Sequence, residues 1–303
     1  MKNNMISILN FGSLNIDHVY HVASFVRPGE TVSSLRYDRI PGGKGLNQSV
    51  TLARAGANVF HAGKVGSDGK FLVELLRRDG VNTDWVAENG SVTGHACIQV
   101  DENGQNCIVL HGGANREITV DEVHQVLDAF HAGDWLVLQN EISCLPEIVQ
   151  AAAERELVIV LNPSPITPDL LKMDLSPVSY LLLNETEGKD LTGETQPQKI
   201  TAALLGRYPN LKIVLTLGGD GALYADAASS VSVPACSVQA VDTTAAGDTF
   251  TGYFIAAVSA GEPVREALIR ASQAAAIAVS RPGASISIPN KQELDDFRQV
   301  FAE

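Results

Sequence analysis

The sequence predicts a doubly wound α/β fold, in which a mostly parallel sheet is flanked by helices and a small β-sheet forms a lid. Short apolar runs alternate with helical patterns over most of the 303 residues. Several runs are apolar at consecutive positions, which is typical of strands buried on both faces of a parallel sheet. Residues 30–40 and 92–111 have no helical pattern. We therefore expect one domain over residues 1–303, with lid segments at about 12–40 and 92–111 inserted in it.

The apolar runs define the strands of the expected large sheet. They cover residues 6–12, 59–66, 134–140, 157–162, 179–184 and 212–218. Helices are expected between them. From Leu46 to Ala57, apolar residues recur at three- and four-residue spacing, which predicts a helix. Thr119 and Glu122 have the spacing of a capping box, which begins a helix that extends to Phe130.

Glycines and polar residues mark where these elements end. Gly80 and Gly133 are expected to end helices, because glycine readily adopts the left-handed conformation that follows a last turn. Asn103 and Gly104 predict a hairpin turn within residues 92–111. In a doubly wound sheet, ligands bind beyond the carboxyl ends of the strands. The polar residues expected there are Asn15, Asp17, Glu141, Asn162, Asn184 and Thr216.

Composition and charge exclude several classes of protein. A net charge of -13 and a pI near 4.9 oppose binding to nucleic acid or to an anionic membrane. The four cysteines form no CxxC pair and the seven histidines no HExxH pair, so neither pattern indicates a zinc site. The N-terminal apolar run MISIL is too short for a signal peptide or a membrane span. We expect a cytoplasmic protein with reduced thiols.

The motif VDTTAAGDTF, residues 241–250, carries the most specific chemistry. Small residues surround Gly247, Asp248 follows it, and an apolar helix begins there. The free N–H groups and the dipole of a helix N-terminus favour an anion. A carboxylate repels an anion, so Asp248 is expected to have a chemical task rather than to bind phosphate.

Two glycine-rich motifs allow more than one interpretation. PGGKGLNQSV, residues 41–50, is either a close backbone approach to a ligand or only a turn into a helix. Its spacing is not that of a Walker phosphate loop. TLGGDGAL, residues 216–223, is either a tight turn or a backbone wall for a nucleotide, and SRPGASIS, residues 280–287, is by itself only a loop.

Near two expected strand ends, an asparagine is followed closely by an acidic residue. Asn15 and Asp17 end the first expected strand and point to the same side of it, where they either bind vicinal hydroxyls or form an Asx turn. Asn184 and Glu187, in LLLNETEG, have the pattern of a helix N-cap, which is a common structural arrangement.

The order and spacing of these motifs resemble the ribokinase-like (PfkB-type) family of carbohydrate kinases, from about residue 6 to about residue 300. The resemblance implies ATP-dependent phosphorylation of the hydroxymethyl group of a pentose, foremost D-ribose to ribose 5-phosphate. The alternatives are a sister kinase for 2-deoxyribose, another pentose, a ketose or a nucleoside, and a non-catalytic sugar or nucleotide sensor. Intact Gly247 and Asp248 argue against a sensor.

The resemblance also implies the roles of individual residues. It makes Asp248 the catalytic base and gives the anion hole to the N–H groups of Ala245, Ala246 and Gly247. The residues expected around the sugar are Asn15, Asp17, Gly43, Lys44, Asn47, Ala96, Ile98, Ile108, Glu141 and Asp248. Those expected around ATP are Asn184, Thr216, Gly218, Gly219, Asp220, Gly221, Gly247 and Ser272.

Cations and a partner chain follow from the same resemblance. Mg²⁺ is expected near Glu187, through its waters. A monovalent cation, K⁺, is expected at Asp242, Thr244, Ala278, Arg281, Gly283 and Ser287. The lid strands are expected to form a homodimer. Leu46, Asn140 and Thr244 depart from the usual residues of the family, and these departures leave the identity of the sugar open.

Overall fold

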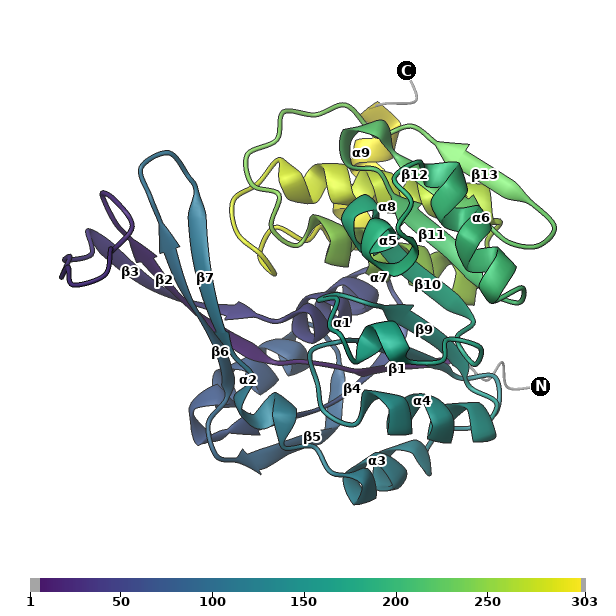
Figure 1. Ribbon diagram of the computed structural model, residues 1–303, viewed down its shortest axis with the longest axis horizontal. Helices are drawn as coiled ribbons and strands as arrows, with labels where there is room; N and C mark the ends of the chain where they lie inside the picture. The colour runs from purple at the N-terminus through teal and green to yellow at the C-terminus, as the bar shows by residue number, and fades with distance from the viewer. Residues whose placement is uncertain (1–5, 301–303) are drawn as a thin grey trace.

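The computed structural model describes residues 6–300, in which a nine-stranded sheet is covered by helices and a four-stranded sheet projects from one side (Figure 1). The strands of the large sheet are β1 (Ser7–Phe11), β4 (Asn58–Gly66), β5 (Asn82–Gly90), β8 (Trp135–Gln139), β9 (Val158–Asn162), β10 (Tyr180–Asn184), β11 (Lys212–Thr216), β12 (Ala222–Ala225) and β13 (Ser230–Val233). Their order is β13-β12-β11-β10-β9-β8-β1-β4-β5. Neighbouring strands from β5 to β11 in this order are parallel, whereas β12 pairs antiparallel with both β11 and β13.

The predicted fold class is confirmed, and every predicted strand is present. The apolar pattern did not reveal β5 and β13. These two strands form the edges of the sheet, and most of their side chains are exposed or only half-buried. An edge strand therefore lacks the continuous apolar run that identifies a central one.

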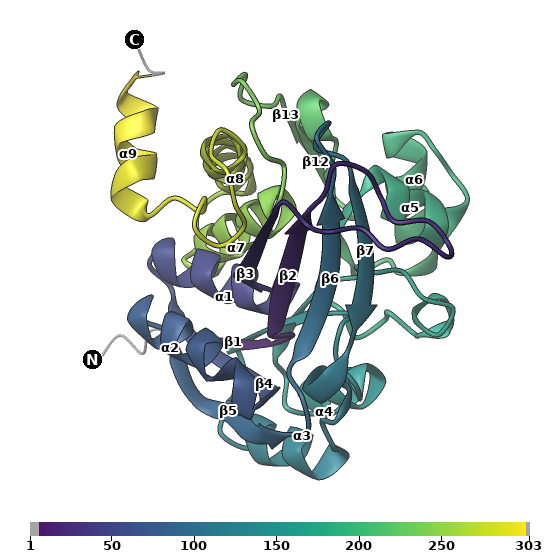
Figure 2. The same cartoon turned by 90° about the vertical axis from the view of Figure 1, so that its left-hand side faces the viewer.

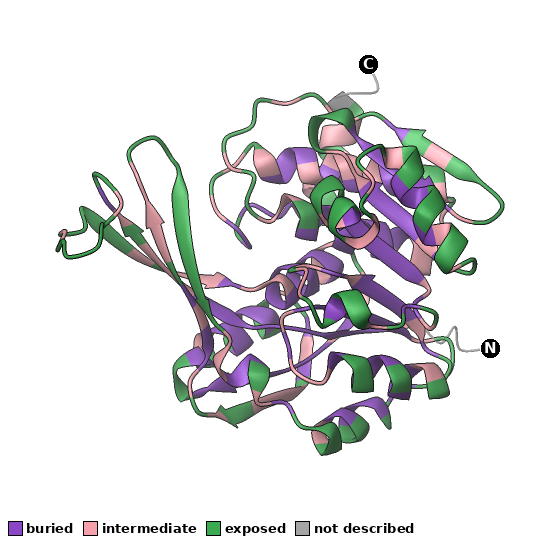
Figure 3. Ribbon diagram, viewed as in Figure 1, coloured by how far each residue is buried: buried purple, intermediate pink, exposed green. Residues whose placement is uncertain are grey.

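Helices cover both faces of the large sheet. They are α1 (Lys44–Arg54), α2 (Lys70–Arg78), α3 (Val120–Leu127), α4 (Leu145–Glu154), α5 (Glu185–Thr192), α6 (Pro197–Arg207), α7 (Ala246–Ser259), α8 (Val264–Val279) and α9 (Lys291–Val300). Successive strand residues face opposite ways, so Ile8 packs in the core beneath α1, α2, α7 and α8, and Leu9 in the core beneath α3, α4 and α6. Figure 3 shows both buried layers on either side of the sheet.

The capping box that begins α3 is confirmed, but the expected end of this helix was wrong. Glu122 N donates to Thr119 Oγ1 at 3.3 Å, and Thr119 N donates to Glu122 Oε2 at 2.9 Å. The helix ends at Leu127, because the chain turns there and Phe130 N donates to Leu127 O at 3.1 Å. Gly133, with φ 88°, instead forms the turn that leads into β8.

The four-stranded sheet contains β2 (Asn15–His21), β3 (Arg36–Gly42), β6 (Gly94–Val100) and β7 (Asn106–His111), in the order β3-β2-β6-β7 (Figure 2). The expected second sheet is therefore present, with a turn at Gly104 where φ is 75°. The expectation that Asn15 and Asp17 end the first strand was wrong. β1 ends at Phe11, and the chain crosses α1 so closely at Gly12 that a Cβ there would lie 2.7 Å from Gly45 Cα.

The direction of the chain across the large sheet reverses between β1 and β8. From β1 the chain continues to β4 on one side, and from β8 it continues to β9 on the other. The turns that follow these two strands meet, because Ser13 Oγ donates a hydrogen bond to Glu141 Oε2. Ligands of doubly wound sheets bind at such a reversal, beyond the carboxyl ends of the strands.

Candidate active site

The site is built around the first turn of α7. Ala245, the residue before the helix, has a left-handed backbone with φ 60°, although it is not a glycine. Such a conformation costs a non-glycine residue about 1–2 kcal/mol. It turns the chain sharply into the helix, whose first N–H groups, at Gly247 and Asp248, have no carbonyl within the helix to bind. The N–H of Ala246 donates to Thr243 O at 3.3 Å.

The carboxylate of Asp248 is buried and held by two side-chain amides of α1. Asn47 Nδ2 donates to Oδ2 at 3.0 Å, and Gln48 Nε2 donates to Oδ1 at 2.9 Å. Asp248 is only 8% exposed. These two hydrogen bonds join the motif at residues 41–50 to the motif at residues 241–250, which together carry most of the predicted function. The sequence motifs indicated Asn47 and Asp248, whereas Gln48 was not expected in the site.

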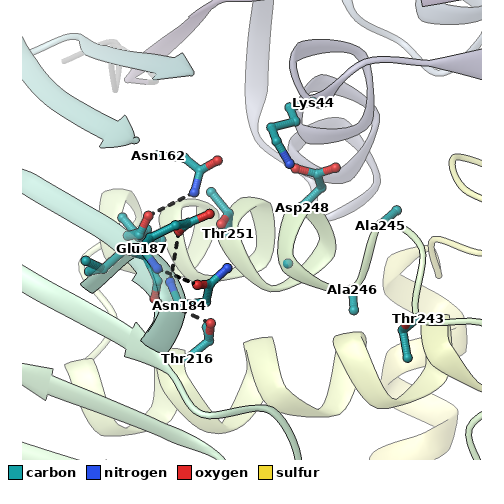
Figure 4. Close-up of a pocket in the computed structure, with 13 residues that line it drawn as sticks. Lys44, Asn162, Asn184, Glu187, Thr216, Thr243, Ala245, Ala246, Asp248 and Thr251 are labelled. Carbon is teal, nitrogen blue, oxygen red and sulfur yellow. Dashed lines mark hydrogen bonds between the residues drawn. The ribbon is translucent and has the colours of Figure 1, made fainter. Parts of the chain in front are cut away.

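Lys44 places a positive charge beside this carboxylate. Figure 4 shows its amine pointing toward the carboxylate of Asp248, and both residues line the same cavity. Burial lowers the pKa of Lys44, but the carboxylates of Asp248, Glu141 and Glu187 raise it, and the net effect is a rise. The amine therefore stays protonated at neutral pH, where it can bind an anionic group.

A polar cavity of about 240 Å³ opens next to Asp248. It is lined by residues at the ends of parallel strands and at the start of α7, namely Lys44, Asn162, Leu182, Leu183, Asn184, Glu187, Thr216, Thr243, Ala245, Ala246, Gly247, Asp248 and Thr251. Asn184 and Glu187 form a capping box at the start of α5, with bonds of 2.9 and 3.0 Å, as the N-cap interpretation predicts. The same two residues also line the cavity, so the N-cap arrangement leaves them available to a ligand there.

An adjacent, mostly apolar cavity of about 370 Å³ shares Thr216, Thr243, Ala246 and Gly247 with the polar one. Its other lining residues are Gly218, Gly219, Gly221, Ala235, Cys236, Val238, Ala240, Phe250, Ser272, Ala275, Ala276 and Val279. Most of the residues predicted to contact ATP are therefore present in one or both cavities. Asp220 is exposed in the same turn and lines neither. The loop 235–240 was not expected, because it has no sequence pattern.

The expected sugar residues of the small sheet share one face of it. Asp17 pairs with Ala96 and Ile98 pairs with Ile108, and alternate residues of a strand face the same side. Asp17 lies so close to β3 that a Cβ on Gly42 would lie 2.2 Å from its Oδ2. Ile108 is 53% exposed. The outer part of this face is thus open, and its inner part continues to the start of α1.

Buried Asn115 holds Asn15 in place, although no motif predicted it. Asn115 Nδ2 donates to Asn15 Oδ1 at 2.7 Å, and Leu14 N donates to Asn115 Oδ1 at 3.0 Å. Since its carbonyl oxygen is engaged, Asn15 is set to offer its N–H groups to a ligand.

Two carboxylates, Asp17 and Glu141, make the side of the site next to the small sheet acidic. Lys44 N and Ser13 Oγ both donate to Glu141 Oε2, the former at 3.1 Å. Burial raises the pKa of Glu141, an effect that Lys44 partly offsets. Burial and, secondarily, the charge of Glu141 raise the pKa of Asp17 to about 6. The two groups therefore lie close enough to influence each other.

Most residues expected around a monovalent cation lie in two loops that contact each other, and Ala278 lies in the last turn of α8. Asp242 Oδ1 accepts from Thr244 N and Oδ2 from Gly283 N, both at 2.9 Å. Burial raises the pKa of Asp242, but the hydrogen bonds to its carboxylate lower it more, so the pKa lies below its usual value. Ala278 O accepts from Arg281 N at 3.2 Å, and Ser287 Oγ donates to Ala284 O at 2.9 Å. The Arg281 side chain pairs with Glu293.

Leu46 and Asn140, which differ from the usual residues of the family that the motifs resemble, lie outside the two cavities. Leu46 is fully buried in the apolar core beneath α1. Asn140 Nδ2 donates to Pro165 O at 2.6 Å and to Thr167 Oγ1 at 3.1 Å, so it joins two loops at the edge of the sheet. Thr244 is an exposed residue of the loop before α7, and its N–H binds Asp242.

The fold and the site together define an enzyme class. A buried carboxylate beside an open helix N-terminus, with a polar and an apolar cavity next to it, suits a kinase that phosphorylates a small hydroxylated substrate. The chain matches the model of the pfkB family of carbohydrate kinases over residues 5–291. It belongs to this family and is a carbohydrate kinase, as the motif resemblance predicts.

Known ribokinases are similar to it over nearly their whole length. The chain is 36% identical to the ribokinase of Haemophilus influenzae over 297 residues, which are 94% of this chain and 96% of the relative. The ribokinase of Cryptococcus neoformans var. grubii serotype A, in complex with ADP, superimposes with a TM-score of 0.83 at 34% identity, covering 97% of this chain and 99% of that one. Arabidopsis thaliana ribokinase, complexed with ribose and ATP, gives a TM-score of 0.84 at 28% identity, with 97% and 98% covered.

No helix within residues 6–300 is both long and apolar enough to cross a membrane. All four cysteines are free. In the same described part of the chain, no group of three or more His, Cys, Asp or Glu side chains could hold a metal ion.

Proposed function

We propose that this enzyme transfers the γ-phosphoryl group of ATP to the hydroxymethyl oxygen of D-ribose, which yields ribose 5-phosphate and ADP. The position of Asp248 carries the proposal, because its buried carboxylate joins the sugar motif of α1 to the anion site of α7. Family membership supports a carbohydrate substrate. The similar Arabidopsis thaliana protein, solved with ribose and ATP, supports these two substrates.

Asp248 acts as the base in this proposal. The hydroxymethyl oxygen attacks the γ-phosphorus, the bond from that phosphorus to the bridging oxygen of ADP breaks, and the proton passes to the carboxylate of Asp248. The N–H groups of Ala245, Ala246 and Gly247 stabilise the charge on the moving phosphoryl group. The 3.3 Å bond from Ala246 N to Thr243 O is long, so a phosphoryl oxygen can replace the carbonyl at little cost.

The sugar lies between the small sheet and α1. None of the described residues donates a hydrogen bond to Asn47 Oδ1, although this oxygen is buried. A hydroxyl of the sugar would satisfy it. Asp17 and Asn15 form hydrogen bonds with the 2- and 3-hydroxyls of the sugar. Asp17 accepts and the side-chain amide of Asn15 donates. Gly43, Lys44 and Glu141 complete the inner side, while Ala96, Ile98 and Ile108 cover the sugar when the small sheet closes as a lid.

ATP occupies the two adjacent cavities, with its base in the apolar one and its phosphates in the polar one. Mg²⁺ fits the donors present, since Glu187 and Asn184 offer oxygen atoms at the polar cavity and this ion usually keeps several waters. When bound, it supplies positive charge to the phosphates. Lys44 binds the terminal phosphates from the opposite side of the cavity.

Three further properties belong to the proposal. K⁺ occupies the paired loops at Asp242 and Gly283 and orders the turn before α7. Two chains associate through their lid strands, where Ile108, Val109 and Leu110 are exposed apolar side chains. The enzyme works in the cytoplasm, which is consistent with its free cysteines.

The test is the release of ADP by the native enzyme with a panel of pentoses, hexoses and nucleosides. Ribose should give the highest kcat/KM. A preference for 2-deoxyribose or a nucleoside would assign a different substrate within the family. No ADP release with any member of the panel would contradict a kinase function and indicate a sensor.

A further inference from the structure

A continuous row of buried polar side chains lies behind Asp248. Gln48 Nε2 donates to Asp248 Oδ1 at 2.9 Å, and Gln139 Nε2 donates to Gln48 Oε1 at 2.7 Å. Gln48 and Gln139 are fully buried. They come from α1 and from the end of β8, which lie far apart in the sequence. The row thus connects the first turn of α7 to the middle of the large sheet.

The row continues into the core through three more side chains. Gln139 Nε2 also donates to Asn10 Oδ1 at 2.9 Å, and Asn10 Nδ2 donates to Ser49 Oγ at 2.8 Å. Ser49 Oγ lies 2.7 Å from His61 Nδ1. Burial lowers the pKa of His61 to about 3, so its ring is neutral at the far end of the row.

These bonds fix the orientation of the Gln48 amide. A side-chain amide has one oxygen that accepts and one nitrogen that donates. Because Gln139 occupies the oxygen of Gln48, the nitrogen of Gln48 must face Asp248. Gln139 is in turn oriented by Asn10, whose own nitrogen is bound to Gly45 O at 2.7 Å and to Ser49.

We propose that Gln48 is a positioning residue for Asp248 and that Gln139 positions Gln48. The proposal rests on the proposed role of Asp248 as the base. Asn47 also donates to Asp248, but its free oxygen is available to the sugar, whereas both polar atoms of Gln48 are bound within the protein. Gln48 therefore holds the carboxylate in place before the sugar arrives and after it leaves. Buried amides are costly to keep unless they are bonded in this way.

The charged groups near Asp248 stay in place when Gln48 is replaced by methionine. They are Lys44 on α1, Glu141 after β8 and Glu187 on α5. A fall in kcat of such a variant therefore reports on the lost hydrogen bond and not on a lost charge.

The experiment compares the native enzyme with Gln48→Met and Gln139→Met. For Gln48→Met we expect kcat to fall about tenfold or more, which is typical of the loss of a hydrogen bond to a charged group, while KM for ribose stays within about threefold. Gln139→Met should lower kcat by a smaller amount, again with KM within about threefold of the native value. This second variant provides the test if Gln48→Met does not fold.

Thr201→Val is the matched control. Thr201 is a buried polar residue of α6 whose hydroxyl donates to Gln198 O of its own helix at 3.1 Å, so its loss should leave kcat and KM as in the native enzyme. A glutamine variant with the native kcat, or one in which only KM changes, would overturn the proposal. If the native enzyme phosphorylates no sugar, the proposed function fails instead, and the two failures are thus distinguishable.

Discussion

The backbone N–H of Lys44 donates to Oε2 of Glu141 at 3.1 Å, so the start of α1 is tied to the turn after β8. Ser13, which follows β1, donates to the same oxygen. Glu141 is therefore fixed at the point where the chain reverses direction across the sheet. Its charge adds to the effect of burial on Asp17, whose pKa rises to about 6. The part of the site around Asp17 is thus sensitive to pH near neutrality.

Ribose affinity should depend on the ionisation of Asp17. The carboxylate accepts hydrogen bonds from two hydroxyls only when it is ionised, and with a pKa of about 6 it is mostly protonated at pH 5. The Kd for ribose should therefore fall about tenfold between pH 5 and pH 7.5, in proportion to the ionised fraction. Isothermal titration calorimetry at several pH values measures this. A Kd that does not vary over this range would contradict the role of Asp17.

The variant Asp17→Asn provides the control through stability. Because the pKa of Asp17 is raised on folding, the native protein is destabilised as the pH rises from 3.8 through about 6. Replacing Asp17 by neutral asparagine should raise the free energy of unfolding at pH 8, by up to ~3 kcal/mol at about 1.4 kcal/mol per pH unit of pKa. At pH 3 the two proteins should unfold alike. Denaturant titrations at both pH values check the sign.

Ribose should be preferred over 2-deoxyribose. Asp17 and Asn15 offer an acceptor and a donor to two hydroxyls, and a buried polar group left without its partner costs about 1–3 kcal/mol. We therefore expect kcat/KM for ribose to exceed that for 2-deoxyribose by about tenfold or more. A coupled assay of ADP release with each sugar measures the ratio. Equal or better use of 2-deoxyribose would mean that the 2-hydroxyl is not recognised.

Leu46→Ala should affect stability rather than sugar preference. Leu46 is fully buried in the core and lies outside both cavities. Truncation of a buried leucine to alanine costs about 2–5 kcal/mol. The melting temperature should drop, while the ratio of kcat/KM for ribose and 2-deoxyribose stays as in the native enzyme. A changed ratio in the folded variant would show that this side chain shapes the sugar site.

K⁺ should activate the enzyme more than Na⁺. The loops around Asp242 and Gly283 are already joined by a 2.9 Å hydrogen bond, and a cation there would order the turn that leads to Ala245. Activity measured in KCl, NaCl and the chloride of a bulky organic cation should be highest in KCl. The same activity in all three salts would contradict a monovalent cation site.

The sequence predicted the central strands and most of the residues that line the polar cavity, for identifiable physical reasons. Buried parallel strands are apolar at consecutive positions, so β8 and β10 could be located directly. Because their carboxyl ends meet at one edge, Glu141 and Asn184 could be expected in one site. The small residues around Gly247 follow from the requirements of an anion site at a helix N-terminus, and Asp248 stood out because a carboxylate does not suit such a site.

The buried amides could not be predicted in this way. Asn10 and Gln139 stand within apolar strands and Gln48 on a helix, where single polar residues usually face solvent. Their bonds depend on which strands become neighbours, and the partners of Gln48 are residues 139 and 248. Cys236 and Val238 line the apolar cavity from a loop without periodicity. Such contacts are set by the tertiary fold and leave no local pattern.

The central claim is that Asp248 takes the proton of the sugar hydroxyl during phosphoryl transfer from ATP. Its most direct test is to measure kcat for ribose phosphorylation together with the Kd for ribose, in the native enzyme and in Asp248→Asn. We predict that kcat falls ~100-fold or more, the usual contribution of a general base, while Kd changes by less than about threefold. A variant that turns over at nearly the native rate would contradict the assignment.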